Sequence, residues 1–249
     1  MMGMLLWKSP EAGKREKRMA LTERSVLHMR FACVEVVRGP KTPSAVLRRR
    51  VASAAKKLHR AGVTRAVLPP DFPFSAELEK YGVRPVSTLP LRRALAAETV
   101  GWRLERLGLT AGARVAVVGE QLTGELVRTV TELCLRCRYV LLDLPYGGEE
   151  LSRQLRREYG VSLLLGPSKE QLEGAEALVL FGERQDLNRK NPVVRALYEG
   201  VGDALPPLVL PSAMEERLPA GCDRPQLLSA LREAGALRPG QISLGTSKG

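Results

Sequence analysis

Apolar residues along this chain follow two patterns, short continuous runs and recurrences at every third or fourth position. The first clear run, Met29–Val37, is strand-like, and apolar residues then recur at helical spacing from Ser44 to near Gly62. Short runs typical of buried strands continue to alternate with amphipathic segments over most of the remaining sequence. This alternation favours a parallel sheet with helices packed against it. The sequence therefore predicts an α/β fold.

The predicted elements form two units joined by a helix. We expect a smaller α/β unit over residues 29–88, a linking helix over 89–111 and a Rossmann-like domain with a parallel sheet over 112–239. In this last domain, apolar runs predict strands at 114–119, 139–144, 161–165, 177–181 and 207–210. Helical spacing predicts helices at 122–134, 149–159, 169–173, 192–200 and 224–234.

The two ends of the chain differ from this pattern. Residues 1–28 carry little apolar periodicity and a basic run, so we expect a disordered leader, and we expect a flexible tail over 240–249. The apolar segment Met1–Trp7 lacks the basic residues and the cleavage site of a signal peptide. No apolar run approaches the roughly 18–20 residues that span a bilayer. Four cysteines in 249 residues do not form a disulfide framework. We therefore expect a cytoplasmic protein with no membrane partner.

The stretch Arg114–Asp143 has the layout of a dinucleotide-binding βαβ unit. A strand pattern ends at Gly119, an amphipathic helix follows, and a second strand pattern ends at Asp143. Such folds carry three glycines, which allow the tight turn, the approach of a pyrophosphate to backbone N–H groups, and close packing of the helix. Gly119 and Gly124 occupy the first and third positions, whereas Gln121 occupies the second.

Polar residues of this turn oppose phosphate binding. A Gln121 side chain would intrude at the pyrophosphate position, and Glu120 and Glu125 suit a helix N-terminus but would repel a pyrophosphate. The two alternatives are a turn that still binds a cofactor and a turn whose role is structural. The candidate cofactor contacts are Gly119, Glu120, Gln121, Thr123, Gly124, Asp143 and Gly182.

The segment Gly119–Val127 resembles the turn in the NADPH-binding domain of glutamyl-tRNA reductases, which reads G-x-G-x-x-G-E-L. The order of a small α/β unit, a linking helix and a Rossmann unit also resembles shikimate dehydrogenases. Both resemblances imply a Rossmann-like, NAD(P)-binding domain. The chain departs from both families, because Cys33 lies in a strand-like segment rather than in the Cys-Asn-Arg setting of the reductase nucleophile. The Lys and Asp motifs of shikimate dehydrogenases are also missing.

Asp143 bears on the identity of the cofactor. The basic Asn-Arg-Thr signature that holds an NADP phosphate in these families is replaced by Asp143-Leu-Pro-Tyr-Gly147. A carboxylate at this position can accept a hydrogen bond from a ribose 2′-hydroxyl but repels a 2′-phosphate, so it favours NAD. The alternative is that Asp143 caps the turn that follows its strand.

Charge is distributed unevenly along the chain. The formal net charge is +12, and residues 1–70 hold 16 Lys and Arg against 4 Asp and Glu, which accounts for the whole excess. The predicted helix over 44–61 carries Arg49, Lys56 and Arg60, which are candidates for contact with a nucleic acid or another acidic partner. The alternative is an ordinary solvated basic helix. Aromatic residues make up only 4% of the chain, so no stacking platform for single strands is evident.

Few other residues are candidates for chemistry. Cys134 and Cys137 have CxxC spacing, but no second pair follows, so we expect core packing and no metal site. Asp71 follows a strand end, the edge at which open α/β sheets bind ligands, and is a candidate substrate contact. No nucleophile, base and orienting residue combine into a catalytic set.

Three hypotheses for function follow. The leading one is a degenerate dinucleotide-binding domain in which nucleotide binding is weak or lost. The second is an NAD-dependent oxidoreductase, whose hydride chemistry the cofactor would supply. The third is a module that binds nucleic acid or an acidic partner through the basic helix over 44–61.

Overall fold

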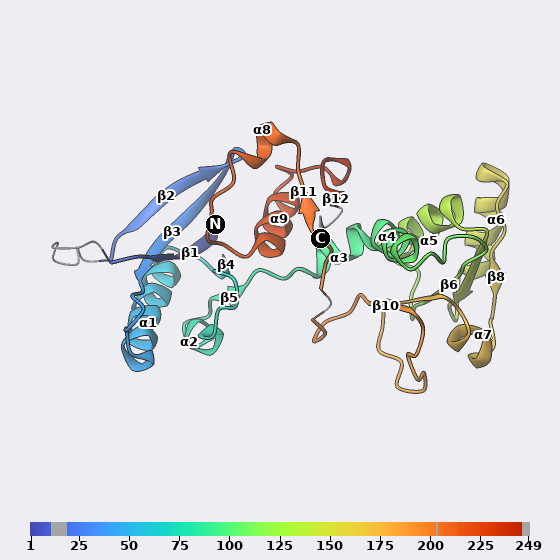
Figure 1. The fold of residues 1–249 in the computed structure, drawn as a ribbon, viewed down its shortest axis with the longest axis horizontal. Coiled ribbons are helices and arrows are strands. Elements are labelled where there is room, and N and C mark those ends of the chain that lie inside the picture. The colour runs from blue at the N-terminus through green and yellow to red at the C-terminus, as the bar shows by residue number, and fades with distance from the viewer. Residues whose placement is uncertain (11–18, 203, 246–249) are drawn as a thin grey trace. The chain divides into compact units, whose positions relative to one another are not determined.

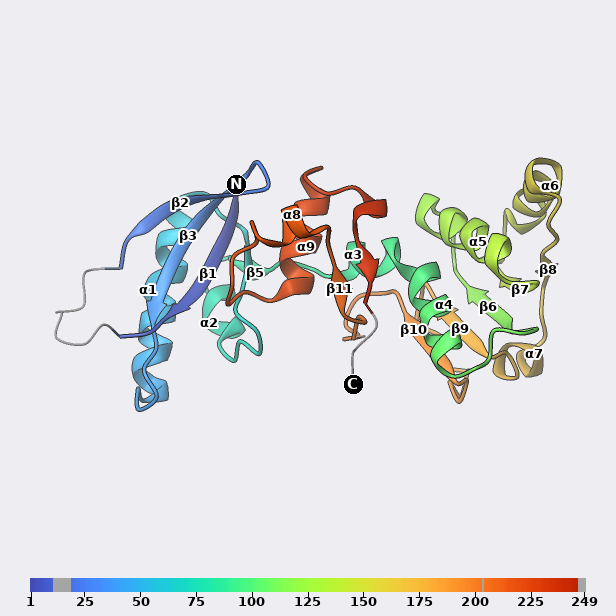
Figure 2. The ribbon, with the colours of Figure 1, turned by 45° about the horizontal axis from the view of Figure 1, so that its top comes forward.

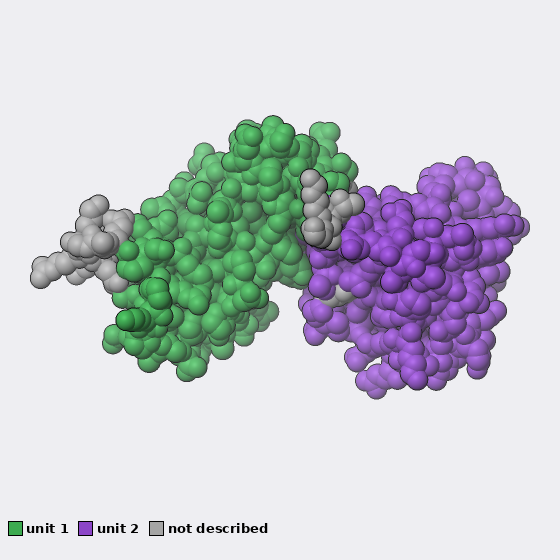
Figure 3. Space-filling view, viewed as in Figure 1, with its two compact units in different colours: residues 1–88, 208–243 green, residues 89–207, 244–249 purple. Residues whose placement is uncertain are grey.

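The computed structural model describes residues 1–10, 19–202 and 204–245, and it has an α/β fold (Figure 1). The chain forms two compact units, coloured separately in Figure 3. The first unit comprises residues 1–88 and 208–243, and the second comprises 89–207 and 244–249. Each unit is built around its own five-stranded sheet.

The first unit has a mixed sheet with the strand order β2-β3-β1-β4-β5. Only β2 is antiparallel to its neighbour, and the other strands run parallel. The strands are β1 (Met2–Lys8), β2 (Leu21–Val26), β3 (Met29–Val37), β4 (Arg65–Val67) and β5 (Arg84–Pro85).

Helix α1 (Ser44–Arg60) covers one face of this sheet, alongside the shorter α2 (Ser75–Glu79). The buried residues of α1 recur at helical spacing and pack against apolar residues of the strands, among them Leu5 of β1 and Val34 of β3. The strand at 29–37 and the helix after Pro43 therefore form as their patterns predict.

The expectation of a disordered leader over residues 1–28 is wrong for the described part of that segment. β1 is the central strand of the first sheet, paired with β3 along its whole length and with β4. A strand buried on both faces reads as a continuous apolar run without alternation, so its pattern alone does not distinguish it from an apolar leader. β2 also lies within the expected leader, while residues 11–18 are outside the described residues.

A segment from far along the chain completes the first unit, so the expected Rossmann boundary at residue 239 is wrong. α9 (Arg224–Glu233), labelled in Figure 2, contacts β4, beside which the Leu68 N–H donates to Gln226 Oε1 at 3.0 Å. Ser229 Oγ also donates to the carbonyl of Ser87, at 2.7 Å. The segment further contains β11 (Leu208–Val209), α8 (Ser212–Glu215) and a 3₁₀ turn, Pro239–Gln241. The expected tail over 240–249 is wrong for Ser243–Leu244, because these residues form β12, which pairs with β11.

The second unit has a parallel sheet with the strand order β10-β9-β6-β7-β8. When these strands are numbered 1 to 5 in chain order and the sheet is read from the β8 edge, the order is 3-2-1-4-5, which is the Rossmann order, so the unit is Rossmann-like. The strands are β6 (Arg114–Val118), β7 (Tyr139–Asp143), β8 (Leu164–Leu165), β9 (Ala177–Leu180) and β10 (Val193–Ala196).

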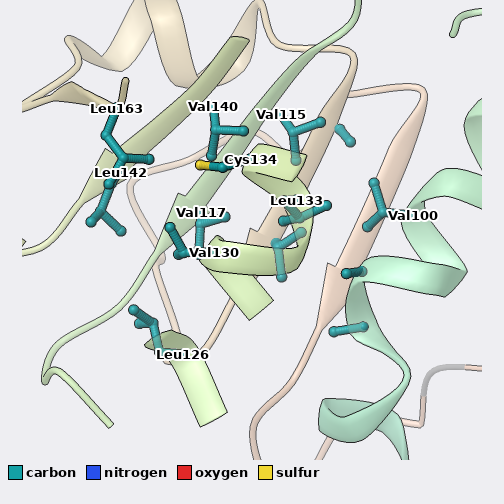
Figure 4. Close-up of a cluster of buried hydrophobic side chains, with 14 of the residues drawn as sticks. Val100, Val115, Val117, Leu126, Val130, Leu133, Cys134, Val140, Leu142 and Leu163 are labelled. Carbon is teal, nitrogen blue, oxygen red and sulfur yellow. The ribbon is translucent and has the colours of Figure 1, made fainter. Parts of the chain in front are cut away.

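Alternate residues of these strands enter two cores on opposite faces. Val115 and Val117 of β6 face α5 (Gly124–Arg136) and α6 (Gly148–Tyr159), as the close-up in Figure 4 shows for part of this cluster. Ala116 and Val118 face the other way, toward Leu172 of α7 (Lys169–Glu173). Because both faces are covered, the buried residues of β6, β7 and β9 are apolar on both faces, as in other parallel sheets.

Two further expectations for this unit are corrected. The linking helix over 89–111 is two helices, α3 (Leu89–Ala94) and α4 (Ala96–Arg106), and both belong to the second unit. α4 packs against α5 and β10. The segment 192–200 contains the strand β10 instead of a helix, because Val193–Ala196 pairs in register with β9.

Candidate functional site

The turn between β6 and α5 follows the strand–glycine–helix layout expected from the sequence. The Gly119 N–H donates to the carbonyl of Asp143 at 3.0 Å and so extends the pairing of β6 with β7. A Cβ at Gly119 would overlap Cδ1 of Leu126, which is fully buried in the core. This position therefore requires glycine for close packing of strand and helix.

The role expected for Gly124 as the packing glycine is not supported. A Cβ built on Gly124 would meet no atom within 4 Å. Thr123 instead caps α5, because its Oγ1 accepts a hydrogen bond from the Leu126 N–H at 3.2 Å. One of the backbone donors that a Rossmann turn would offer to a phosphate is thus bound by the chain's own hydroxyl.

A pocket of about 290 Å³ lies at the carboxyl ends of β6, β7 and β9. β6 lies between β7 and β9, so this is the topological switch point at which open α/β sheets bind ligands. The pocket is lined by Val118, Gly119, Glu120, Asp143, Pro145, Gly182 and Arg184. Four of the seven candidate cofactor residues, Gly119, Glu120, Asp143 and Gly182, therefore come together.

The Glu120 side chain lies over Gly182, across the ends of β6 and β9. A Cβ added at Gly182 would lie 2.9 Å from Oε1 of Glu120. Glycine at 182 thus leaves the space that the Glu120 carboxylate takes. In a dinucleotide-binding domain this crevice receives the pyrophosphate, and a carboxylate there opposes an anionic ligand.

Asp143 is held by an arginine that the sequence pattern does not single out. Nη1 of Arg184 lies 2.5 Å from Oδ2 of Asp143, and the same guanidinium makes two hydrogen bonds to Asp186, of 2.7 and 3.0 Å. The bonds to Asp186 and then to Asp143 raise the pKa of Arg184 further above its usual range. The Arg184 guanidinium in turn lowers the pKa of Asp186 to about 2. This cluster therefore places two acidic side chains around one arginine.

A second arginine is held at the start of α5. Nη1 of Arg93, from α3, lies 2.8 Å from Oε2 of Glu125, and its Nε donates to the carbonyl of Leu197 at 2.8 Å. Its guanidinium also lies over the ring of Phe181. Glu125 thus has a partner within the protein and complements the positive end of the α5 dipole.

The remaining candidate residues lie apart from this pocket. Gln121, Thr123 and Gly124 are exposed in the same turn and do not line it. Asp71 is exposed in the first unit, where its φ is +50°.

The three basic candidates on α1 are all exposed. Arg49, Lys56 and Arg60 have spacings of seven and four residues. At 100° per residue these spacings place them on one side of the helix, opposite its buried face. In the part of the chain that the structure describes, none of the three has an ion pair or a hydrogen bond.

The two cysteines with CxxC spacing contribute to packing. Cys134 is buried in the core of the second unit, and Cys137 packs against the same core. Burial raises the pKa of the Cys134 thiol to about 11, which opposes thiolate chemistry. Within residues 1–10, 19–202 and 204–245, no group of three or more His, Cys, Asp or Glu side chains could hold a metal ion.

The sequence matches no protein-family model and no curated protein. Among solved structures, L-tryptophan dehydrogenase from Nostoc punctiforme is 14% identical, with a TM-score of 0.30 over 66% of this chain and 48% of that one. A hetero-hexameric glutamate dehydrogenase from Thermus thermophilus is 18% identical, with a TM-score of 0.29 over 68% and 51%. Ornithine carbamoyltransferase from Pyrococcus furiosus is 17% identical, with a TM-score of 0.27 over 60% and 50%.

The chain spans about half the length of these structures. Their names denote different reactions, so they assign no activity to this chain. No helix among the described residues is both long and apolar enough to cross a membrane.

Proposed function

We propose that the second unit is a Rossmann-like domain in which dinucleotide binding is weak or lost and whose present role is that of a scaffold. The observation that carries this proposal is the position of Glu120 over Gly182, where a pyrophosphate would enter. Two further features support it, namely the bridge from Arg184 to Asp143 and the Thr123 cap on α5. Among the residues that line the pocket, the one cation is already bound to carboxylates, so an incoming phosphate finds no free positive charge.

An NAD-dependent oxidoreductase is the second candidate, and Asp143 at the end of β7 favours it. A carboxylate there can accept hydrogen bonds from a ribose, and it disfavours the 2′-phosphate of NADP. In this structure the carboxylate is bound to Arg184, so ribose binding would have to displace or share that hydrogen bond. Displacement of a charge-assisted bond lowers the affinity for the cofactor.

Calorimetric titration with NAD, NADH, NADP and NADPH tests the proposal. We expect the unmodified protein to bind none of them with a Kd below about 1 mM, which corresponds to roughly 4 kcal/mol of binding free energy. A variant with Glu120→Ala and Gln121→Gly restores the full glycine turn and removes the carboxylate, so it should gain affinity for NAD or NADH. Glu183→Ala is the matched control, because it removes an exposed carboxylate near the pocket that does not line it.

Two results would contradict the proposal. Micromolar binding of NAD or NADH by the unmodified protein, weakened by Asp143→Ala, would favour the oxidoreductase. An equal gain in affinity from Glu183→Ala would show that net charge, rather than the Glu120 side chain, limits binding.

A further inference from the structure

The net positive charge of this protein belongs almost entirely to its first unit. Counted over the two units, the formal charge is +11 for residues 1–88 and 208–243, and +1 for the rest. In the second unit, acidic and basic residues nearly balance. A surface that attracts polyanions should therefore lie on the first unit.

Helix α1 concentrates this charge. Its 17 residues include six Lys or Arg and no Asp or Glu. An ordinary solvated helix carries both signs, because oppositely charged neighbours stabilise it. Because α1 carries only positive side chains, it lacks the stabilisation that oppositely charged neighbours provide, and its positive charges repel one another.

Two of the six cations are used within the fold. Arg50 donates to the carbonyl of Val37 at 2.7 Å, and Lys57 donates to the carbonyl of Met19. Both lie on the flank of the helix. The outermost side of α1 is formed by Arg49, Lys56 and Arg60, which we call the basic face.

The basic face is long, narrow and free of large apolar groups. At 1.5 Å per residue, Arg49 and Arg60 are separated by roughly 16 Å along the helix axis. The residues beside them on the same side are small, namely Ala45, Ala52 and Ser53. The apolar side of α1 is buried against the sheet, so the helix has no apolar surface with which to enter a lipid interface.

Aromatic stacking is also missing from this face, which argues against single strands. Trp7, Phe72 and Phe74 of the first unit contact one another, and α1 itself contains no Phe, Tyr or Trp. Single-strand binding relies on bases stacked on exposed rings, whereas contacts to a duplex backbone need only correctly spaced cations. Duplex DNA presents about one phosphate charge per 1.7 Å of its axis, so the length of the face lies over several phosphates.

We propose that the basic face of α1 binds the phosphate backbone of double-stranded nucleic acid, without reading its sequence. Arg49, Lys56 and Arg60 each contact a phosphate, and the short residues between them allow the helix to approach the backbone closely. This inference concerns the first unit alone, so it is independent of whether the pocket of the second unit binds a nucleotide.

Fluorescence anisotropy with a labelled 20-base-pair DNA duplex, between 50 and 200 mM NaCl, tests the proposal. Three phosphate contacts predict a slope of log K against log salt of about −2.7 or steeper, which is a loss of roughly 40-fold over this range. The variant Arg49→Gln/Lys56→Gln/Arg60→Gln should have a slope less negative by about 2.7. The variant Arg49→Lys/Arg60→Lys should bind nearly as well as the unmodified protein, because a phosphate contact requires charge rather than a fixed shape.

The matched control removes three exposed cations from a helix of the other unit. Arg153→Gln/Arg156→Gln/Arg157→Gln on α6 changes the net charge by the same amount. We expect it to leave the slope unchanged. Circular dichroism melts of each variant establish that the fold is retained.

Other polyanions identify the partner. A duplex RNA of the same sequence should bind with similar affinity, because the contacts are to phosphates, and a single strand should bind more weakly. The proposal is overturned if the α1 variant keeps the affinity and slope of the unmodified protein, or if the α6 control loses as much. Tighter binding to polyglutamate or to phosphatidylserine vesicles than to the duplex would assign the face to an acidic protein or a membrane, and would equally overturn it.

Discussion

Arg184 Nη1 lies 2.5 Å from Asp143 Oδ2, so a residue just after β9 covers the carboxylate that ends β7. These two strands flank β6 on either side. The ion pair therefore spans the switch point of the sheet from one side to the other. Arg184 thereby binds the Asp143 carboxylate, which in a dinucleotide-binding domain would accept a hydrogen bond from the ribose.

This pair should contribute modestly to stability and should respond to salt. About 30% of each side chain is exposed, so a double-mutant cycle with Arg184→Met and Asp143→Asn should give a coupling of about 0.5–1 kcal/mol in urea unfolding. The coupling should fall in 1 M NaCl, because screening acts on partly exposed charges. The exposed pair Arg153–Glu150 on α6 serves as a control with a smaller coupling. A coupling that is identical at both salt concentrations would contradict a mainly electrostatic bridge.

The two glycines of the β6–α5 turn should respond oppositely to alanine. Gly119→Ala forces Leu126 out of its buried position and should destabilise the protein by about 1–3 kcal/mol. Gly124→Ala meets no neighbouring atom at the start of α5 and should be neutral or stabilising by up to about 0.5–1 kcal/mol. Thermal and urea unfolding of the two variants measure the difference. Equal destabilisation would show that both glycines are needed for packing.

Acid should weaken the contact between α8 and α9. Arg224 binds both carboxylate oxygens of Glu215 at 2.6 Å, and this lowers the pKa of Glu215 below its ordinary value of 4.5. When folding lowers the pKa of a carboxyl group, the group stabilises the fold at every pH above its pKa in the unfolded chain. That contribution is lost as the pH falls through its pKa in the folded protein. Urea unfolding between pH 7 and pH 3 should therefore show a smaller loss of stability for Glu215→Gln than for the unmodified protein. The control Glu183→Gln, at an exposed site, should follow the unmodified protein.

Cys134 should be nearly inert in the folded protein. Its thiol has a pKa raised by burial to about 11, so little thiolate exists at pH 8. Labelling with iodoacetamide at pH 8, followed by mass spectrometry, should modify Cys134 far more slowly in native than in urea-unfolded protein. The raised pKa also means that this group's contribution to stability is lost as the pH rises from about 9 toward 11. Rapid native labelling would reopen a redox role for the CxxC pair.

The periodicity of apolar residues predicted helices and strands whose ends are marked by residues nearby in the sequence. The strand Met29–Val37 and the helix Lys169–Glu173 have the expected bounds, because a glycine or a capping box marks their ends. β1 was not predicted, since a strand buried on both faces has no alternation to distinguish it from a leader. The return of residues 208–243 to the first unit leaves no trace in local periodicity, because it depends on contacts between distant segments.

The candidate site was predicted in part for the same reason. Gly119 and Asp143 each lie at the carboxyl end of a strand of the βαβ unit. Because the two strands are adjacent and parallel, the topology places these residues side by side. Arg184 and Arg93 enter from a loop and from a helix outside that unit, and no motif specifies them. The weak signal for Arg184 was its position soon after a strand end, two residues beyond Gly182.

The discontinuous first unit has a consequence for protein synthesis. The ribosome makes β1 to β5 first, yet α9, which packs beside β4, emerges only after the entire second sheet. During translation the second unit can bury its core while the first still lacks one of its helices. The first sheet is therefore complete long before the helix that packs beside it, and until α9 emerges the nascent chain exposes the apolar surface that α9 later covers.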